Sequence, residues 1–150
     1  MALTKLNFSG QPTLPVSSFP TGSVLQVKEN TAQTEAALTT TSYSATSTTV
    51  QITPSSSTST ILVMGRMPFQ TASSGMISFS LFRDSTNLGN NDFGRIYIPS
   101  TDVEGTVIFE DSPSTTSQIT YSIQAKVSSG THYININNAM STIVAMEIKQ

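Results

Sequence analysis

Gln118-Ile-Thr-Tyr-Ser-Ile-Gln-Ala-Lys-Val127 is the stretch of the sequence that decides the fold. Apolar or aromatic side chains occupy every odd position from Ile119 to Val127, and polar side chains occupy every even position. Successive side chains of a β-strand point to opposite faces, so this alternation predicts a strand with one buried face and one solvent-facing face.

Shorter alternations of the same kind occur on both sides of this stretch. They cover Val24–Val27, Thr49–Thr53, Ile61–Phe69, Met76–Arg83, Arg95–Ile98, Thr106–Glu110, His132–Ile136 and Thr142–Ile148. Runs rich in Ser, Pro, Gly, Asn and Asp separate them, and no segment shows a convincing helical period. Eight or more short strands without intervening helices predict an all-β fold. We expect a two-sheet antiparallel, jelly-roll-like sandwich over residues 22–150.

Residues 1–21 depart from this pattern. Pro12, Pro15 and Pro20 each remove a backbone donor and favour an extended residue before them, so we expect an extended N-terminal arm rather than a helix or a central strand. The apolar side chains spaced along it are Leu3, Leu6, Phe8, Leu14, Val16 and Phe19. We predict that they anchor the arm in grooves of a neighbouring subunit or of another protein, the alternative being a free tail.

Two predicted strands carry apolar residues on both faces. In one, Ile61 and Val63 lie on one face and Leu62 and Met64 on the other. In the last strand, Val144 and Met146 lie on one face and Ile143 and Ala145 on the other. A sandwich strand needs only one apolar face, so the arm or a neighbouring copy of the chain must cover the second. A closed homo-oligomer follows as a prediction. The residues assigned to its interface are Leu62, Met64, Ile143 and Ala145.

The charge and composition exclude several classes of partner. Charged residues make up 11% of the chain, the formal net charge is -2, and the seven basic residues are scattered. A nucleic-acid partner is therefore not expected. The absence of cysteine removes disulfides and thiolate metal sites, and no apolar window is long enough to span a bilayer. We predict no cofactor, no metal and no membrane insertion.

The sequence offers little catalytic chemistry. His132 is the only histidine, no recognisable nucleophile motif surrounds it, and one histidine cannot form a conventional zinc site. Two carboxylate pairs, Asp102 with Glu104 and Glu110 with Asp111, could in principle act across a sugar bond. They fall at predicted strand ends or loops, where solvated acids are ordinary, so we predict that the chain is not an enzyme.

Two further features have a structural and a functional interpretation. The loop Asp84–Asp92 concentrates oxygen ligands that could hold calcium, but it lacks the EF-hand pattern, and Asn, Asp and Gly equally serve tight turns. We therefore expect a turn. Exposed aromatic residues could form a sugar-binding platform, with Tyr43, Phe93, Tyr97 and Tyr133 as the candidates. Core or interface positions are the expected ones for these rings.

An ordered set of segments over residues 21–148 resembles a known module. The segments are Thr21-Gly-Ser-Val-Leu-Gln-Val27, Thr49-Val-Gln-Ile-Thr-Pro-Ser-Ser-Ser57 leading into Thr60-Ile-Leu-Val63, Asp111-Ser-Pro-Ser-Thr-Thr-Ser117 with Thr120-Tyr121, Ser129-Gly-Thr131 with Tyr133-Ile-Asn135, and Ser141-Thr-Ile143 closing on Met146-Glu-Ile148. The set is similar to the C-terminal module of tail-fibre and other structural proteins of marine and cyanobacterial tailed phages. That resemblance implies a β-sandwich virion protein, often trimeric and exposed at the particle surface.

The expected function follows from the resemblance and the arm together. We expect a virion structural protein, a trimeric surface knob whose arm attaches it to phage capsid or tail proteins, as a capsid decoration or cement protein or as a short fibre. One alternative is a receptor-binding fibre tip that contacts a host surface glycan. Another is a carbohydrate-binding module, which would bind an isolated glycan without needing the arm.

Overall fold

The computed structural model describes residues 15–71, 75–89, 91–92, 94–96 and 101–150. Within these residues the chain is all-β, apart from two single 3₁₀ turns at Val16–Ser18 and Ile136–Asn138. The strands are β1 (Val24–Ala32), β2 (Ala36–Leu38), β3 (Ser44–Ile52), β4 (Thr60–Thr71), β5 (Ile77–Arg83), β6 (Thr86–Asn87), β7 (Gly94–Ile96), β8 (Thr101–Asp111), β9 (Ile119–Val127), β10 (His132–Ile134) and β11 (Ser141–Ile148). The all-β prediction is confirmed.

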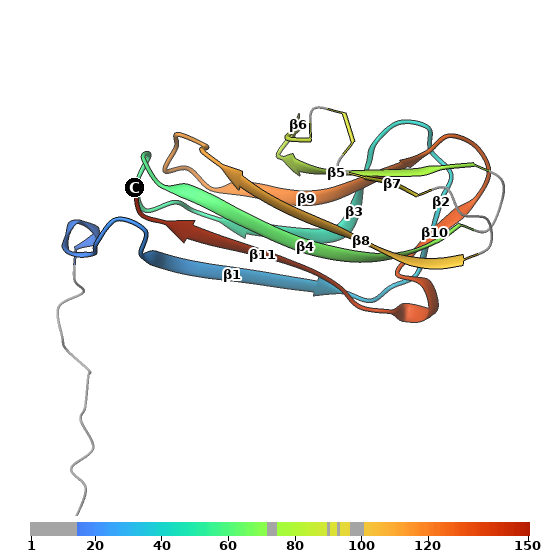
Figure 1. Ribbon diagram of the computed structural model, residues 1–150, viewed down its shortest axis with the longest axis horizontal. Helices are drawn as coiled ribbons and strands as arrows, with labels where there is room; N and C mark the ends of the chain where they lie inside the picture. The colour runs from blue at the N-terminus through green and yellow to red at the C-terminus, as the bar shows by residue number, and fades with distance from the viewer. Residues whose placement is uncertain (1–14, 72–74, 90, 93, 97–100) are drawn as a thin grey trace, which may run out of the picture.

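The strands form two stacked antiparallel sheets (Figure 1). The six-stranded sheet has the order β1-β11-β4-β10-β2, with β8 on the other side of β4, and the five-stranded sheet has the order β3-β9-β5-β6, with β7 also paired to β5. When the short β2, β6 and β10 are set aside, eight strands remain. They pair first with last, second with seventh, third with sixth and fourth with fifth. This is the rolled antiparallel ribbon of a jelly roll.

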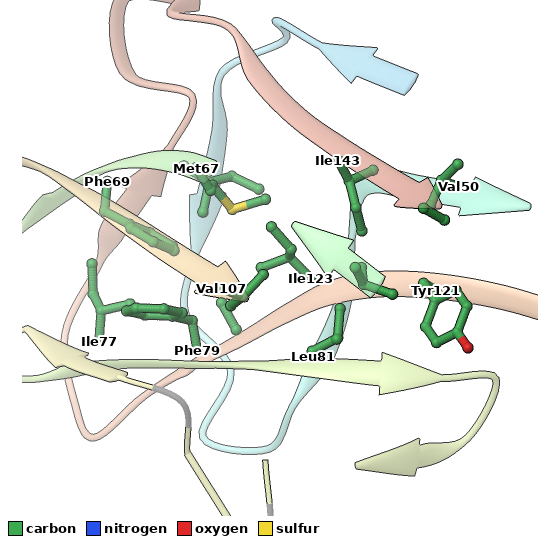
Figure 2. Close-up of a cluster of buried hydrophobic side chains, with 14 of the residues drawn as sticks. Val50, Met67, Phe69, Ile77, Phe79, Leu81, Val107, Tyr121, Ile123 and Ile143 are labelled. Atoms are coloured by element: carbon green, nitrogen blue, oxygen red, sulfur yellow. The ribbon is translucent and has the colours of Figure 1, made fainter. Parts of the chain in front are cut away.

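The core lies between the two sheets and uses the alternation seen in the sequence. Along β9 the inward side chains from Ile119 to Val127 are all buried. The rings of Phe69 on β4 and Phe79 on β5 stack across the layers with centroids 5.3 Å apart (Figure 2). Burial of apolar surface between two alternating layers is therefore the main source of stability, as expected for a chain without disulfides.

Pro68 lies within β4, a strand that is paired on both sides. On one side β11 pairs with β4 only as far as Arg66, and β10 begins pairing at Phe69, so Pro68 falls at the junction of the two partners. The Asn135 N–H donates to the Pro68 carbonyl over 2.8 Å. Because no ladder partner faces the missing N–H at this junction, proline is tolerated in an otherwise central strand.

The predicted arm differs from expectation where the structure describes it. Residues 16–18 form a 3₁₀ turn instead of an extended segment. The Gly22 N–H donates to the Lys149 carbonyl over 2.8 Å, and the Lys149 N–H donates to the Ser23 carbonyl over 2.9 Å. The Lys149 ammonium also donates to the carbonyls of Ser17 and Phe19. The chain is thus tied to the C-terminal end of β11 before β1 begins.

The six predicted anchoring residues fall on both sides of this boundary. Leu3, Leu6, Phe8 and Leu14 lie outside the described residues. Val16 is half-buried within the 3₁₀ turn, and Phe19 is 38% exposed. Their predicted role in anchoring stays a prediction.

The structure corrects half of the predicted oligomer interface. Ile143 and Ala145 are fully buried in the core of the sandwich. Ala145 lies opposite Val63 in the ladder, and directly opposed residues share a face of the sheet, so both strands turn these side chains inward. Leu62 and Met64 are half-buried and point outward, as predicted. On β11 the outward residues are the even-numbered ones. Sequence reasoning chose the wrong face because both faces of this strand are apolar.

Candidate functional surface

The outer face of the six-stranded sheet is apolar over four adjacent strands. Strand register places the outward side chains of β1, β11, β4 and β8 in rows across the sheet. The apolar members of these rows are Val24, Val27, Leu62, Met64, Ile108, Val144, Met146 and Ile148. We call this set the apolar outer face. Sequence reasoning found Leu62 and Met64 but missed the contributions of β1 and β8, because only the register brings those strands alongside β4 and β11.

Much of the apolar outer face is open to solvent in the isolated chain. Ile108 is 67% exposed, and Val24 and Val27 are each 53% exposed. Met64 and Val144 are half-buried by their neighbours. A shallow apolar depression lies at the border of the face, between the row of Met64, Ile108 and Val144 and the neighbouring row of Arg66, Thr106 and Thr142. A contiguous exposed apolar area of this kind is typical of a surface that another polypeptide covers.

Carboxylates flank the apolar outer face. Glu29 on β1 lies in the same row as Val144, and Glu110 on β8 lies in the same row as Leu62. Both side chains are exposed. Farther along the sheet, Arg66 and Glu104 form an exposed ion pair of 2.8 Å. An apolar centre with a charged border is the usual anatomy of a protein interface.

The outer face of the five-stranded sheet is polar. Its side chains include Ser78, Ser80, Thr120, Ser122, Gln124 and Lys126. The Tyr43 ring packs against Phe82 with centroids 5.3 Å apart, and the Lys126 ammonium lies 4.3 Å from the centre of the Tyr43 ring. The Tyr43 hydroxyl donates to the Asn91 carbonyl over 2.7 Å. This face therefore satisfies its own polar groups within the chain.

The candidate sugar platform is not assembled from the described residues. Tyr43 is engaged in the contacts above, and Tyr133 is half-buried on β10, a strand of the opposite sheet. Phe93 and Tyr97 lie outside the described residues. The described part of the chain therefore brings none of the four aromatic rings together.

The candidate carboxylate pairs have separate structural positions. Glu110 and Asp111 are neighbours in β8, so Glu110 points outward while Asp111 points into the sandwich. Asp102 accepts a hydrogen bond from Gln70 over 2.8 Å, and Glu104 pairs with Arg66. Asp102 and Glu104 both line a shallow hollow beside Pro68 and Asn137, where they are held by Gln70 and Arg66 of β4. Glu110 and Asp111 face opposite sides of the sheet and cannot act together on one bound sugar.

Asp111 connects the two sheets at one end of the sandwich. It belongs to β8, and both its oxygens lie 2.8 Å from an Arg83 guanidinium nitrogen on β5. The Tyr121 hydroxyl on β9 donates to Asp111 over 2.6 Å. Burial, followed by the hydrogen bond to Asp111, raises the pKa of Tyr121 far above its usual range. Sequence reasoning treated Asp111 as a solvated acid and missed this network, which needs residues from three strands.

Glu147 is a second buried carboxylate that sequence reasoning did not identify. It accepts hydrogen bonds from the Gln26 amide over 2.6 Å and from both the backbone N–H and the hydroxyl of Ser55 over 2.7 Å. Burial raises the pKa of Glu147, but the hydrogen bonds outweigh it and leave the pKa below its ordinary value. Glu147 thus ties β11 to β1 and to the loop after β3, a structural role.

His132 and the loop after β5 have structural roles as well. His132 is fully buried, and its Nε2 atom lies 3.0 Å from the Ser129 carbonyl. Asp84 has a left-handed backbone, with φ of 51°, and its side chain accepts a hydrogen bond from the Thr120 N–H over 3.0 Å. Asn87 accepts one from the Gly89 N–H over 2.9 Å. These contacts match the predicted turn.

Among the residues that the structure describes, no group of three or more His, Cys, Asp or Glu side chains could hold a metal ion. Over the same residues, no helix is long and apolar enough to cross a membrane.

These observations define the class of protein as an antiparallel jelly-roll sandwich with one apolar outer face. No protein-family model and no curated protein matches the sequence. Among solved structures, the chain is similar to the infectious bursal disease virus Gt strain structure, with 13% identity and a TM-score of 0.48 over 85% of this chain and 39% of that chain.

Two further similar structures come from the same virus. The T13 viral particle of infectious bursal disease virus gives 12% identity and a TM-score of 0.48, over 93% of this chain and 40% of that chain. The T=1 particles derived from the virus give 12% identity and a TM-score of 0.47, over 93% and 41%. The chain spans about two fifths of the length of these chains. Identity this low carries no information on function.

Proposed function

We propose that this chain is a structural protein of a tailed-phage virion, a trimeric knob at the particle surface whose N-terminal segment attaches it to capsid or tail proteins. The observation that carries the proposal is the apolar outer face of the six-stranded sheet, since it is the most exposed apolar area among the described residues. The ordered segments over residues 21–148 that resemble phage structural modules support it independently.

The energetics favour a covered face. Burial of apolar surface contributes about 25 cal/mol per Å², and fully burying one Val, Ile or Met side chain contributes roughly 1.5 to 3 kcal/mol. Of the eight apolar side chains on the face, only Val24, Val27 and Ile108 are exposed and the other five are already half-buried, so covering the face gains most from these three. A closed ring of copies would cover such faces without leaving an open end.

The outer face of the five-stranded sheet is polar and partly open to solvent. Thr120, Gln124 and Lys126 are half-buried on it, whereas Ser78, Ser80 and Ser122 are buried. With the apolar outer face turned toward neighbouring subunits or the particle, this polar face would point outward. That orientation suits a capsid decoration or cement protein and equally suits a short fibre.

Jelly rolls also occur in metal-binding enzymes and in lectins, so the fold by itself does not establish the proposal. An enzyme of this kind needs a cluster of metal ligands, and the described residues contain none. A carbohydrate-binding module needs convergent aromatic and polar groups, and Tyr43 is instead held by Phe82 and Lys126. A receptor-binding fibre tip is the second candidate, because it shares the trimeric assembly and differs only in what the polar face contacts.

Purified particles provide the direct test. We expect mass spectrometry of gradient-purified virions to find the chain in stoichiometric amounts, and cryo-electron microscopy to show a trimeric knob at the capsid or tail surface. A variant lacking residues 1–14 should fold but fail to be incorporated. Absence of the chain from purified particles would refute the proposal, and arm-independent saturable binding to an isolated glycan would favour a carbohydrate-binding module instead.

A further inference from the structure

We infer that the apolar outer face of the six-stranded sheet is the docking site for residues 2–14 of a second copy of the chain. This inference rests on the proposed function, because it needs several copies to assemble. It replaces a capsid or tail protein with a second copy of the chain as the partner of residues 2–14, so that this segment joins the copies and the assembled knob attaches to the particle. Four features of the molecule support it: the pattern of that segment, its length, the charges around the face, and the place where the segment joins the sandwich.

The sequence of the segment suits an apolar sheet face. In an extended chain the even-numbered side chains lie on one side, and from Lys5 onward the apolar residues Leu6, Phe8, Pro12 and Leu14 are all even-numbered, whereas Leu3 falls on the other side. The odd-numbered side chains from Lys5 to Thr13 are polar. An extended segment would therefore present one apolar side to the face and one polar side to water.

The length of the segment also fits. Thirteen extended residues span at most about 45 Å. The apolar outer face runs along β1 from Val24 to Glu29, which is roughly 20 Å of strand. The segment can therefore cross the face of a neighbour and still have several residues left to bridge the gap between two subunits.

The charges favour this segment over a second sandwich packed face to face. Glu29 and Glu110 are exposed beside the face, and Arg66 is already paired with Glu104. Two copies packed face to face would bring carboxylate borders together, which is unfavourable. Lys5 is the only charged residue among residues 2–14, and its charge complements these carboxylates.

The described chain starts at the end of the sandwich, beside the C-terminus, a position that favours docking on a neighbour. By the alternation of β11, Lys149 falls on the inward side, with Ala145 and Glu147, opposite to the apolar outer face. Its ammonium holds the carbonyls of Ser17 and Phe19. The 3₁₀ turn lies at the end of the sandwich beside the C-terminus (Figure 1).

Cysteine cross-linking of the full chain tests the inference, because the natural sequence contains no cysteine. One copy carries Phe8→Cys and another carries Ile108→Cys, and the mixture is treated with a short bis-maleimide. We expect a product of twice the 16.0 kDa chain mass that contains one copy of each variant. The matched control pairs Phe8→Cys with Gln124→Cys, on the polar outer face of the other sheet, and should give little product.

A substitution that makes the apolar outer face charged provides a second test of the docking. Met64→Glu in the Ile108→Cys copy should lower the yield of the mixed product by at least about tenfold. Met64 is half-buried and points outward, so the thermal unfolding temperature of that copy should change little, and this is measured in parallel. A yield that does not change with Met64→Glu would overturn the inference.

The remaining outcomes separate this inference from the proposed function. A further variant carries both Phe8→Cys and Ile108→Cys in one chain. If it cross-links only within that chain, the segment lies on its own sheet, and the inference that it is exchanged between copies is overturned. Products between two Ile108→Cys copies alone would indicate face-to-face packing and also overturn it. If no mixed product forms although virions contain the chain, the inference fails and the proposed function stands. If the mixed product forms although virions lack the chain, the inference stands and the proposed function fails.

Discussion

Tyr121→Phe removes one hydroxyl from the network that joins the two sheets. Tyr121 is fully buried, and its hydroxyl donates to Asp111 over 2.6 Å (Figure 2 shows the ring among the core side chains). Hydrogen bonds to charged groups contribute roughly 1.5 to 3 kcal/mol. Asp111 keeps its ion pair with Arg83 in the variant, so we expect the free energy of unfolding to fall by about 1.5 to 3 kcal/mol and not more. For a chain of this size that corresponds to a decrease of roughly 3 to 12 °C in the unfolding temperature.

Urea unfolding followed by circular dichroism measures this change, and Tyr133→Phe is the matched control. Tyr133 is half-buried, and the described part of the chain gives its hydroxyl no hydrogen-bond partner. A double-mutant cycle with Asp111→Asn isolates the contribution of the hydrogen bond. If Tyr121→Phe is as stable as the natural chain, or if the cycle gives no coupling, the hydroxyl does not stabilise Asp111 and the argument is refuted.

The same network predicts a loss of stability at high pH. The pKa of Tyr121 is raised above its ordinary value of 10.0 in the folded chain. A raised folded-state pKa contributes stability that is present below pH 10 and is lost as the pH rises above it, because the unfolded chain then ionises more readily. The difference in stability between the natural chain and Tyr121→Phe should therefore shrink above pH 10.

Three further predictions test the inward and outward faces of the six-stranded sheet, the packing at Gly105 and the buried Glu147. Ile108→Thr should change the free energy of unfolding by less than about 0.5 kcal/mol, whereas Ile143→Ala should lower it by about 2 to 5 kcal/mol. Chemical denaturation measures both, and equal losses of stability would contradict the faces assigned to the two residues. Gly105→Ala should cost about 1 to 3 kcal/mol, because a Cβ there would lie 2.6 Å from the Phe69 ring, and unchanged thermal stability would argue against this packing. Glu147→Gln should cost roughly 1 to 3 kcal/mol at pH 7. Because the folded-state pKa lies below its ordinary value of 4.5, the difference from the natural chain should narrow as the pH falls below that value, and a difference that is constant with pH would contradict it.

The strands with a dense or alternating set of apolar residues could be predicted from the sequence with good boundaries. The alternation from Ile119 to Val127 matches β9, and the predicted strand over residues 142–148 matches all but the first residue of β11. Strands without a clear alternation were harder. β1 extends to Ala32, five residues beyond its prediction, because an edge strand with mostly exposed residues carries little hydrophobic pattern. β2 and β6 are too short to give any pattern.

The candidate surface depended on information that the sequence does not carry. Leu62 and Met64 could be predicted to face outward, because the other face of β4 continues from Ile61 and Val63 to Met67 and Phe69. On β11 both faces are apolar, so the sequence could not show that Ile143 faces inward and Val144 outward. Ile108 could not be placed on the same surface until β8 was seen beside β4.

By itself, the sequence determined that the chain is all-β, that it folds without disulfides, and that two of its strands carry apolar residues on both faces. Those properties follow from residue types and from the two-residue period of a strand, which are local. The tertiary structure decided the pairing of distant strands, and with it the apolar outer face and the clustering of Arg83, Asp111 and Tyr121. Register between strands far apart in the sequence fixes which side chains become neighbours, and no local pattern contains it.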